Sequence, residues 1–173
     1  MSFIEPLFHL LAGHLDRIRR NHGLEHATIH LLSQRFPGVF LAGHSDTQGF
    51  WLFGQVPLEA VAQAAQEALE RLRRGERHLA LHPGCGTNYL TSGAMAGLAG
   101  ALAMSGARTR RDRRERLPLV VLAATVALIF SQPVGMWLQE RLTTSGDPGG
   151  LEIVEVIPSQ RGQLPTYRVL TRG

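Results

Sequence analysis

A strongly apolar stretch of 22 residues, Leu117–Leu138, constrains the fold of this chain more than any other feature. Its only polar residues are Thr125, Ser131 and Gln132. Because a helix rises about 1.5 Å per residue, the stretch is long enough to cross the hydrocarbon core of a bilayer. The sequence therefore predicts a transmembrane helix. The alternative is a buried helix in a soluble protein, although core helices of this length without capping residues are uncommon.

A second segment without charge, Tyr89–Ala107, precedes this stretch and is dominated by Gly and Ala. Gly93, Gly97 and Gly100, with Ala96, form small-xxx-small patterns that allow two membrane helices to approach closely. We therefore expect a two-helix transmembrane hairpin, and the same small residues offer a contact for a homo-oligomer. The predicted location is the cell membrane, with two crossings.

The charge distribution favours the lipid bilayer as a partner and argues against nucleic acid. All 18 basic side chains are arginines, against 14 acidic residues, and six of them crowd into the segment 107–116 between the two apolar stretches. An arginine-rich loop favours a cytoplasmic position for that segment. The opposite orientation is favoured by the arginines at 71–77 and by the absence of a recognisable export signal before the first 85 or so residues. The sequence leaves both orientations open.

The remaining segments predict a mixture of helices and strands. Apolar residues recur at helical spacing in three segments, and Gly, Pro and Asn mark the boundaries between elements. We expect helices over Ser2–Arg20, from an N-cap at Asn21 to Phe36, and from Pro57 to Gly75. A β-hairpin is expected from Val39–Ala42 and Gly49–Phe53 around the loop 44–48, and a second strand pair from Leu151–Ile157 and Thr166–Leu170 around the loop Ser159–Pro165.

These elements predict an α+β membrane protein in three parts. Residues 1–87 form a small, helical, histidine-rich metal-binding domain that contains the β-hairpin. Residues 88–139 form the transmembrane hairpin with its arginine-rich loop. Residues 140–173 form a strand pair that packs on the N-terminal domain and returns to its sheet, because two crossings bring the chain back to the same side of the membrane.

The stretch His22-Gly23-Leu24-Glu25-His26 carries the clearest chemical signal. On a helix, positions 22 and 26 lie on one face and position 25 lies close beside them. Imidazole nitrogens are common zinc ligands, and an adjacent carboxylate that is not a ligand can accept a proton from a metal-bound water. The spacing is the inverted form of the His-Glu-x-x-His zinc motif. All eight histidines of the chain precede residue 83.

Further ligands are expected from the turn His82-Pro83-Gly84-Cys85, in which Pro and Gly impose a tight bend. If His82 or Cys85 alone joins the two helical histidines, a coordination position stays open, whereas both together close the site. The expected cofactor is zinc or another divalent transition metal. A buried hydrogen-bonded cluster, or haem or another cofactor, is the alternative. Cys85 is the only cysteine, so no intramolecular disulfide forms.

Two motifs together resemble a known family. His22-Gly23-Leu24-Glu25-His26, followed by His82-Pro83-Gly84-Cys85-Gly86-Thr87 directly before apolar segments, is similar to the YqhQ-like family of uncharacterised bacterial membrane proteins. That resemblance implies a metal-dependent enzyme and covers about half of the chain. This chain is shorter and has fewer membrane segments than the family implies, so a shared site is expected rather than a shared substrate.

Three functions are compatible with these residues. The favoured one is a membrane-anchored zinc-dependent hydrolase, peptidase-like, with His22, His26 and His82 or Cys85 as metal ligands and Glu25 as general base. The second is a non-catalytic membrane module in which a closed His/Cys site stiffens a domain that binds a partner protein. The third uses Cys85 as a nucleophile with His82 or His26 as its base.

Overall fold

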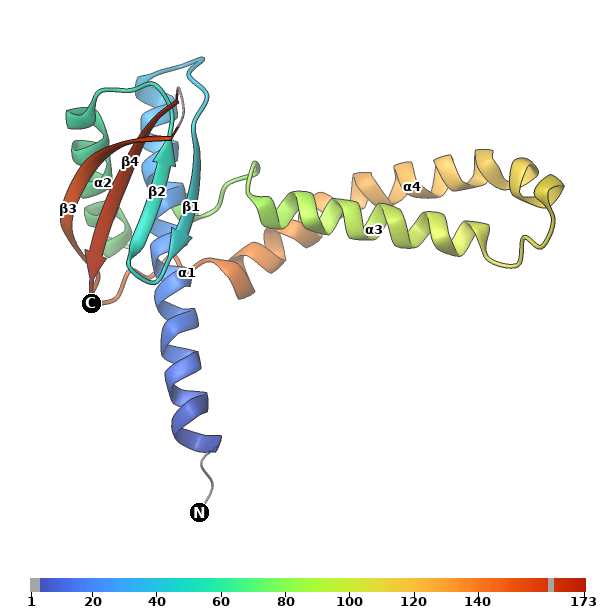
Figure 1. Cartoon of the computed structure of the whole chain (residues 1–173), viewed down its shortest axis with the longest axis horizontal. Helices are drawn as coiled ribbons and strands as arrows, with labels where there is room; N and C mark the ends of the chain where they lie inside the picture. The colour runs from blue at the N-terminus through green and yellow to red at the C-terminus, as the bar shows by residue number, and fades with distance from the viewer. Residues whose placement is uncertain (1–3, 162–163) are drawn as a thin grey trace. The chain divides into compact units, whose positions relative to one another are not determined.

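The computed structural model describes residues 4–161 and 164–173. Over these residues the chain has four α-helices and a four-stranded antiparallel sheet (Figure 1), which confirms the α+β class. It divides into two compact units. The sheet unit comprises residues up to His82 and from Glu140 onward, and the helical unit comprises Pro83–Gln139.

The sheet unit begins with one continuous helix, α1 (Ile4–Arg35), where the sequence predicted two. The predicted N-cap at Asn21 is wrong, and the reason lies in the sheet. Asn21 is fully buried, its Nδ2 donates to the Asp46 carbonyl at 2.8 Å, and its Oδ1 accepts from the Thr171 hydroxyl at 2.7 Å. Because these partners satisfy the amide, the helix continues through this position. Residues 2 and 3 of the predicted first helix lie outside the described residues.

The sheet has the strand order β1-β2-β4-β3, with every neighbouring pair antiparallel. The two C-terminal strands are confirmed and are longer than predicted, and β4 pairs directly with β2 of the first hairpin. The sheet therefore joins the two ends of the chain, as expected. The strands are β1 (Ala42–Asp46), β2 (Gly49–Phe53), β3 (Glu152–Arg161) and β4 (Leu164–Arg172). Residues 162 and 163 of the predicted loop lie outside the described residues.

The first strand is shifted from its predicted position. β1 covers Ala42–Asp46, so most of the predicted loop 44–48 belongs to the strand, and the run Val39–Leu41 precedes it. Thr47 and Gln48 alone connect β1 to β2, and Gly49 follows with φ of 141°. This φ suits glycine, and it allows the tight connection.

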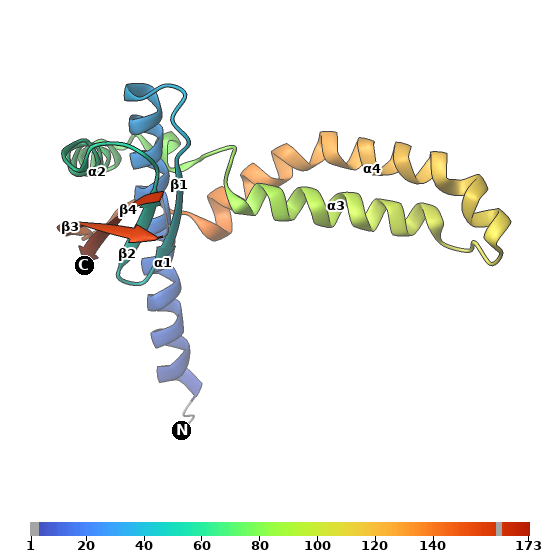
Figure 2. The ribbon, with the colours of Figure 1, turned by 45° about the horizontal axis from the view of Figure 1, so that its top comes forward.

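The core of the sheet unit lies between one face of the sheet and two helices, α1 and α2 (Leu58–Arg73), which lie side by side (Figures 1 and 2). Phe50 and Leu52 alternate onto this face, and their register partners Val169 and Tyr167 continue it on β4. All four side chains are buried. The α2 helix is capped by Pro57, which confirms the predicted start.

The helical unit consists of α3 (Gly86–Met104) and α4 (Arg110–Leu138), which pack against each other. The Ser92 and Ser131 hydroxyls hydrogen-bond at 2.6 Å. At Gly135 a Cβ would lie 2.6 Å from the Asn88 Oδ1, so glycine permits this close approach. A capping box at Thr109 starts α4 within the arginine-rich segment.

Within the described residues, one helix is long and apolar enough to cross a membrane by length and composition. It is α4 with its continuation through η2, a single π-helical turn (Gln139–Thr143), and its most apolar window has a mean hydropathy of 2.0. The predicted pair of membrane spans is therefore corrected to one candidate span. The reason is the composition of α3, in which Gly, Ala, Ser and Thr dominate and supply little apolar surface.

Candidate metal centre

Three histidines of the sheet unit gather beside the middle of α1. His22 and His26 lie one turn apart on this helix, with ring centroids 4.3 Å apart. His82 follows the short 3₁₀ helix η1 (Arg77–Ala80), and its ring centroid is 5.8 Å from that of His26. The structure thus brings together two segments that are more than fifty residues apart in the sequence.

Both helical histidines are oriented by backbone carbonyls. The Nδ1 of His22 lies 2.8 Å from the Thr143 carbonyl oxygen, and the Nδ1 of His26 lies 2.8 Å from the Ala80 carbonyl oxygen. A carbonyl only accepts, so each neutral ring carries its proton on Nδ1 and its lone pair on Nε2. Metal-binding histidines are commonly fixed in this way by a hydrogen bond to the second nitrogen.

Gly23 explains how the Thr143 carbonyl reaches His22. A Cβ at position 23 would lie 2.0 Å from the Ser145 carbonyl oxygen, so only glycine allows the segment 143–145 to lie directly on α1. The Ser145 backbone N–H donates to the Arg19 carbonyl at 2.9 Å and fixes this contact. The glycine of the motif therefore serves the orientation of its first histidine.

Glu25 lies on the side of α1 that faces the sheet. Its side chain is buried, and the Ser45 hydroxyl donates to Oε2 at 2.5 Å. A Cβ at Gly43 would lie 2.3 Å from Oε1, so the carboxylate occupies the space that glycine leaves on β1. Burial raises the pKa of Glu25, and the Ser45 hydrogen bond and the charge of His22 oppose this increase.

The buried Cys85 is the N-cap residue of α3. Cys85 belongs to the helical unit, whereas His22, His26 and His82 belong to the sheet unit. His22 and His26 are the residues of the sheet unit that could contribute to a metal site, and Cys85 stays a predicted ligand. Burial lowers the pKa of His82, and the neighbouring His26 and His30 lower it further, which favours the neutral ring that binds metals.

Two polar residues of β1, His44 and Asp46, lie on the other side of the sheet from Glu25. Gly43 and Ser45 of β1 face α1, so the alternation of the strand directs His44 and Asp46 to the opposite face. There Asp46 accepts from Arg168 at 2.8 Å. Burial alone would raise the pKa of Asp46, but hydrogen bonds and nearby positive charges, with Arg168 foremost among them, together outweigh burial and lower the pKa. Sequence analysis missed Ser45, because only the register of β1 places its hydroxyl against Glu25.

The chain belongs to a family described as a domain of unknown function (DUF6391), whose model matches residues 17–156. It is also 37% identical over 138 residues to an uncharacterized protein of Picosynechococcus sp. (strain ATCC 27264 / PCC 7002 / PR-6). That match covers 74% of this chain and 66% of the relative. No solved structure matches the chain. The YqhQ-like resemblance stays a prediction, and family membership places the candidate centre in a group without an assigned reaction.

Proposed function

We propose that the protein is a membrane-anchored, zinc-dependent hydrolase, peptidase-like in its chemistry. His22, His26 and either His82 or Cys85 hold the metal, and Glu25 is the general base. One observation carries the proposal: each helical histidine donates a hydrogen bond from Nδ1–H to a backbone carbonyl. In zinc sites a hydrogen bond of this kind orients the ring, and Nε2 is then the nitrogen that binds the metal.

The donor set fits zinc better than a hard cation. Imidazole and thiolate are borderline and soft ligands, whereas Mg²⁺ and Ca²⁺ prefer oxygen. Zinc bound there would supply Lewis-acid chemistry: it would polarise a substrate carbonyl and lower the pKa of water. Three protein ligands would leave a position for substrate.

Burial makes Glu25 a stronger base than an exposed glutamate. An ordinary glutamate is a weak base, and burial raises the pKa of this one. The Ser45 hydroxyl orients the carboxylate by donating to Oε2. In this proposal Glu25 takes a proton from the attacking water and passes it to the leaving group.

The same contacts support a second function, a non-catalytic membrane module with a structural metal site. The carboxylate of Glu25 fits tightly against Gly43 and accepts from Ser45, which is also how a buried structural carboxylate is satisfied. In this case both His82 and Cys85 would complete the metal site. The module would then bind a partner protein instead of converting a substrate.

The α4 helix supports the membrane anchor. Its apolar side chains are largely exposed within the chain, and the bilayer is the environment that would cover them. We propose one crossing, in the cell membrane. The substrate would then be reached at the membrane surface.

The test uses the full chain purified in detergent and a library of peptides, esters and amides. We expect chelation to abolish hydrolysis and added zinc to restore it. Glu25→Gln keeps its zinc and loses about a hundredfold or more of the rate, whereas Glu67→Gln, at a partly exposed position of α2, behaves as wild type. Full activity of Glu25→Gln contradicts the proposed base. Bound zinc without hydrolysis of any substrate, together with a lower Tm after chelation, favours the structural module.

A further inference from the structure

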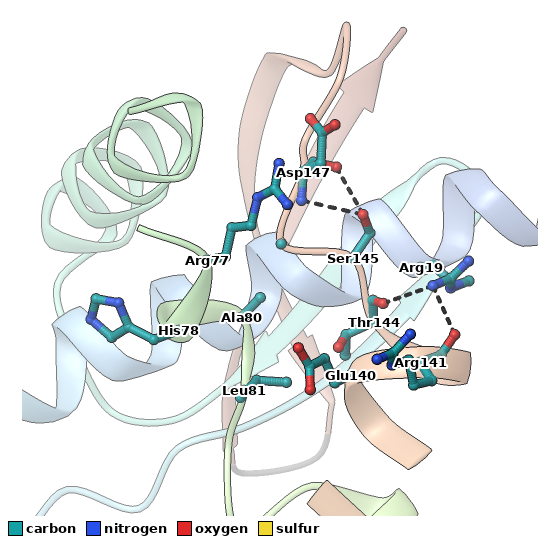
Figure 3. Close-up of a pocket in the computed structure, with 11 residues that line it drawn as sticks. Arg19, Arg77, His78, Ala80, Leu81, Glu140, Arg141, Thr144, Ser145 and Asp147 are labelled. Carbon is teal, nitrogen blue, oxygen red and sulfur yellow. Dashed lines mark hydrogen bonds between the residues drawn. The ribbon is translucent and has the colours of Figure 1, made fainter. Parts of the chain in front are cut away.

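A basic pocket of about 450 Å³ lies in the sheet unit (Figure 3). Its walls come from α1, from η1 and the residues after it, and from the segment 140–147. Ala80 and Thr144 line it: the Ala80 carbonyl accepts from His26, and Thr144 directly follows Thr143, whose carbonyl accepts from His22. The charged residues of the lining are Arg19, Arg77, Arg141, Glu140 and Asp147.

Two of the three arginines are available to a ligand. Arg77 and Arg141 are exposed, and neither forms an ion pair with an acid in the described part of the chain. Acidic side chains lie nearby in the pocket, at Glu140 and Asp147, and the three guanidinium groups outnumber them. The pocket therefore carries a net positive charge.

The third arginine has an unsatisfied donor. Arg19 uses Nη2 to donate to the carbonyls of Arg141 at 3.0 Å and Thr144 at 3.3 Å, as the dashed lines in Figure 3 show. Its Nε–H is buried and has no hydrogen-bond partner among the described residues. Buried donors are rarely left without an acceptor, so a polar or anionic group that reached this nitrogen would complete its hydrogen bonding.

The position of the pocket along the chain indicates which kind of anion would lie near it. Glu140 and Arg141 belong to η2, directly after α4, and the candidate membrane span ends at Thr143. Residues at the end of a membrane span lie at the depth of the lipid head groups, where arginine contacts phosphate. Guanidinium groups match phosphate oxygens with paired hydrogen bonds.

We infer that this pocket binds a phosphate ester through Arg19, Arg77 and Arg141. The phosphate of a lipid head group and that of a soluble phosphate ester share the required chemistry. Binding depends on the arginines and not on a metal, so this inference stands apart from the proposed hydrolase activity. In an ester such as glycerol 3-phosphate, whose alcohol part carries free hydroxyls, the Glu140 and Asp147 carboxylates accept from these hydroxyls.

The experiment is calorimetric titration of the full chain in a non-ionic detergent, after chelation has removed bound metal. The probes are glycerol 3-phosphate and dioctanoyl phosphatidic acid. We expect saturable binding that weakens about tenfold or more in Arg77→Gln and in Arg141→Gln. The control is Arg172→Gln, an exposed arginine paired with Glu152 on the sheet, which binds as wild type.

Each outcome is decisive. Equal affinity for both probes assigns the pocket to soluble phosphate esters, and preference for the lipid assigns it to head groups. The absence of saturable binding for both probes overturns the inference. Binding that is unchanged in both pocket variants, or equally weakened in Arg172→Gln, overturns it as well. Thermal melts of every variant verify folding, and since two exposed arginines are substituted separately, one misfolded variant leaves the other as the test.

Discussion

Substitution of Gly43 displaces Glu25 without changing any metal ligand. In Gly43→Ala the new methyl group would lie 2.3 Å from Oε1, 2.6 Å from Cδ and 2.7 Å from Cγ of Glu25. Ordinary contact begins at 3.4 Å, so the carboxylate has to move by about 1 Å. The side chain is the flexible part of this contact, because α1 contributes residues to the core and β1 is paired with β2 along its length. The movement also lengthens the Ser45 hydrogen bond.

The expected result is a selective loss of catalysis. A misplacement of about 1 Å costs on the order of a hundredfold in rate, and overpacking costs about 1–3 kcal/mol of stability. The assay measures hydrolysis of the best substrate from the library together with zinc content and Tm. The control is Gly13→Ala on α1, where a Cβ meets no atom within 4 Å. An unchanged rate in folded Gly43→Ala would refute the assignment of Glu25 as the base.

Three further predictions concern stability and the membrane. Because burial raises the pKa of Glu25, the metal-free wild type loses stability as pH rises from about 4.5 through the raised pKa. Glu25→Gln removes this loss, so the thermal melts of wild type and variant should coincide at pH 4, and the variant should be the more stable protein at pH 8. Equal melting curves at both pH values would count against a raised pKa. Phe50→Ala empties a fully buried position and should lower the free energy of unfolding by about 3–5 kcal/mol. Phe40 is 75% exposed, so Phe40→Ala should lower it by less than about 0.5 kcal/mol. Similar losses in the two variants would refute the core assignment. Leu128→Arg places a charge in the candidate span, which costs about 2.5–3.5 kcal/mol of insertion free energy. Alkaline carbonate should therefore extract more of this variant from membranes than of the control Leu164→Arg in the sheet. Equal extraction of the two variants would argue against the span.

Local signals in the sequence predicted much of the fold. The strand pair at the C-terminus and the helix capped by Pro57 carry their patterns within a few residues, and both are confirmed. The continuity of α1 could not be predicted, because Asn21 is satisfied by residues 25 and 150 positions away. The first strand was misplaced because the length of the connection at Thr47 and Gln48 decides its register.

For the candidate centre, helical spacing alone predicted that His22 and His26 share a face. The carbonyls that orient them could not be predicted, because any residue supplies a carbonyl and no side-chain pattern marks Thr143. A similar limit applies to the membrane prediction. Small residues in α3 fit a tightly packed partner helix in either solvent, so their spacing overstated the case for a second span.

The most direct test of the metal centre is the zinc content of the purified full chain, measured by elemental analysis. The account predicts about one zinc per chain in the wild type, with loss of zinc in His22→Ala and in His26→Ala. His14→Ala, an exposed histidine on the same helix, should retain it. A metal-free wild type, or zinc retained in both site variants, would contradict the account.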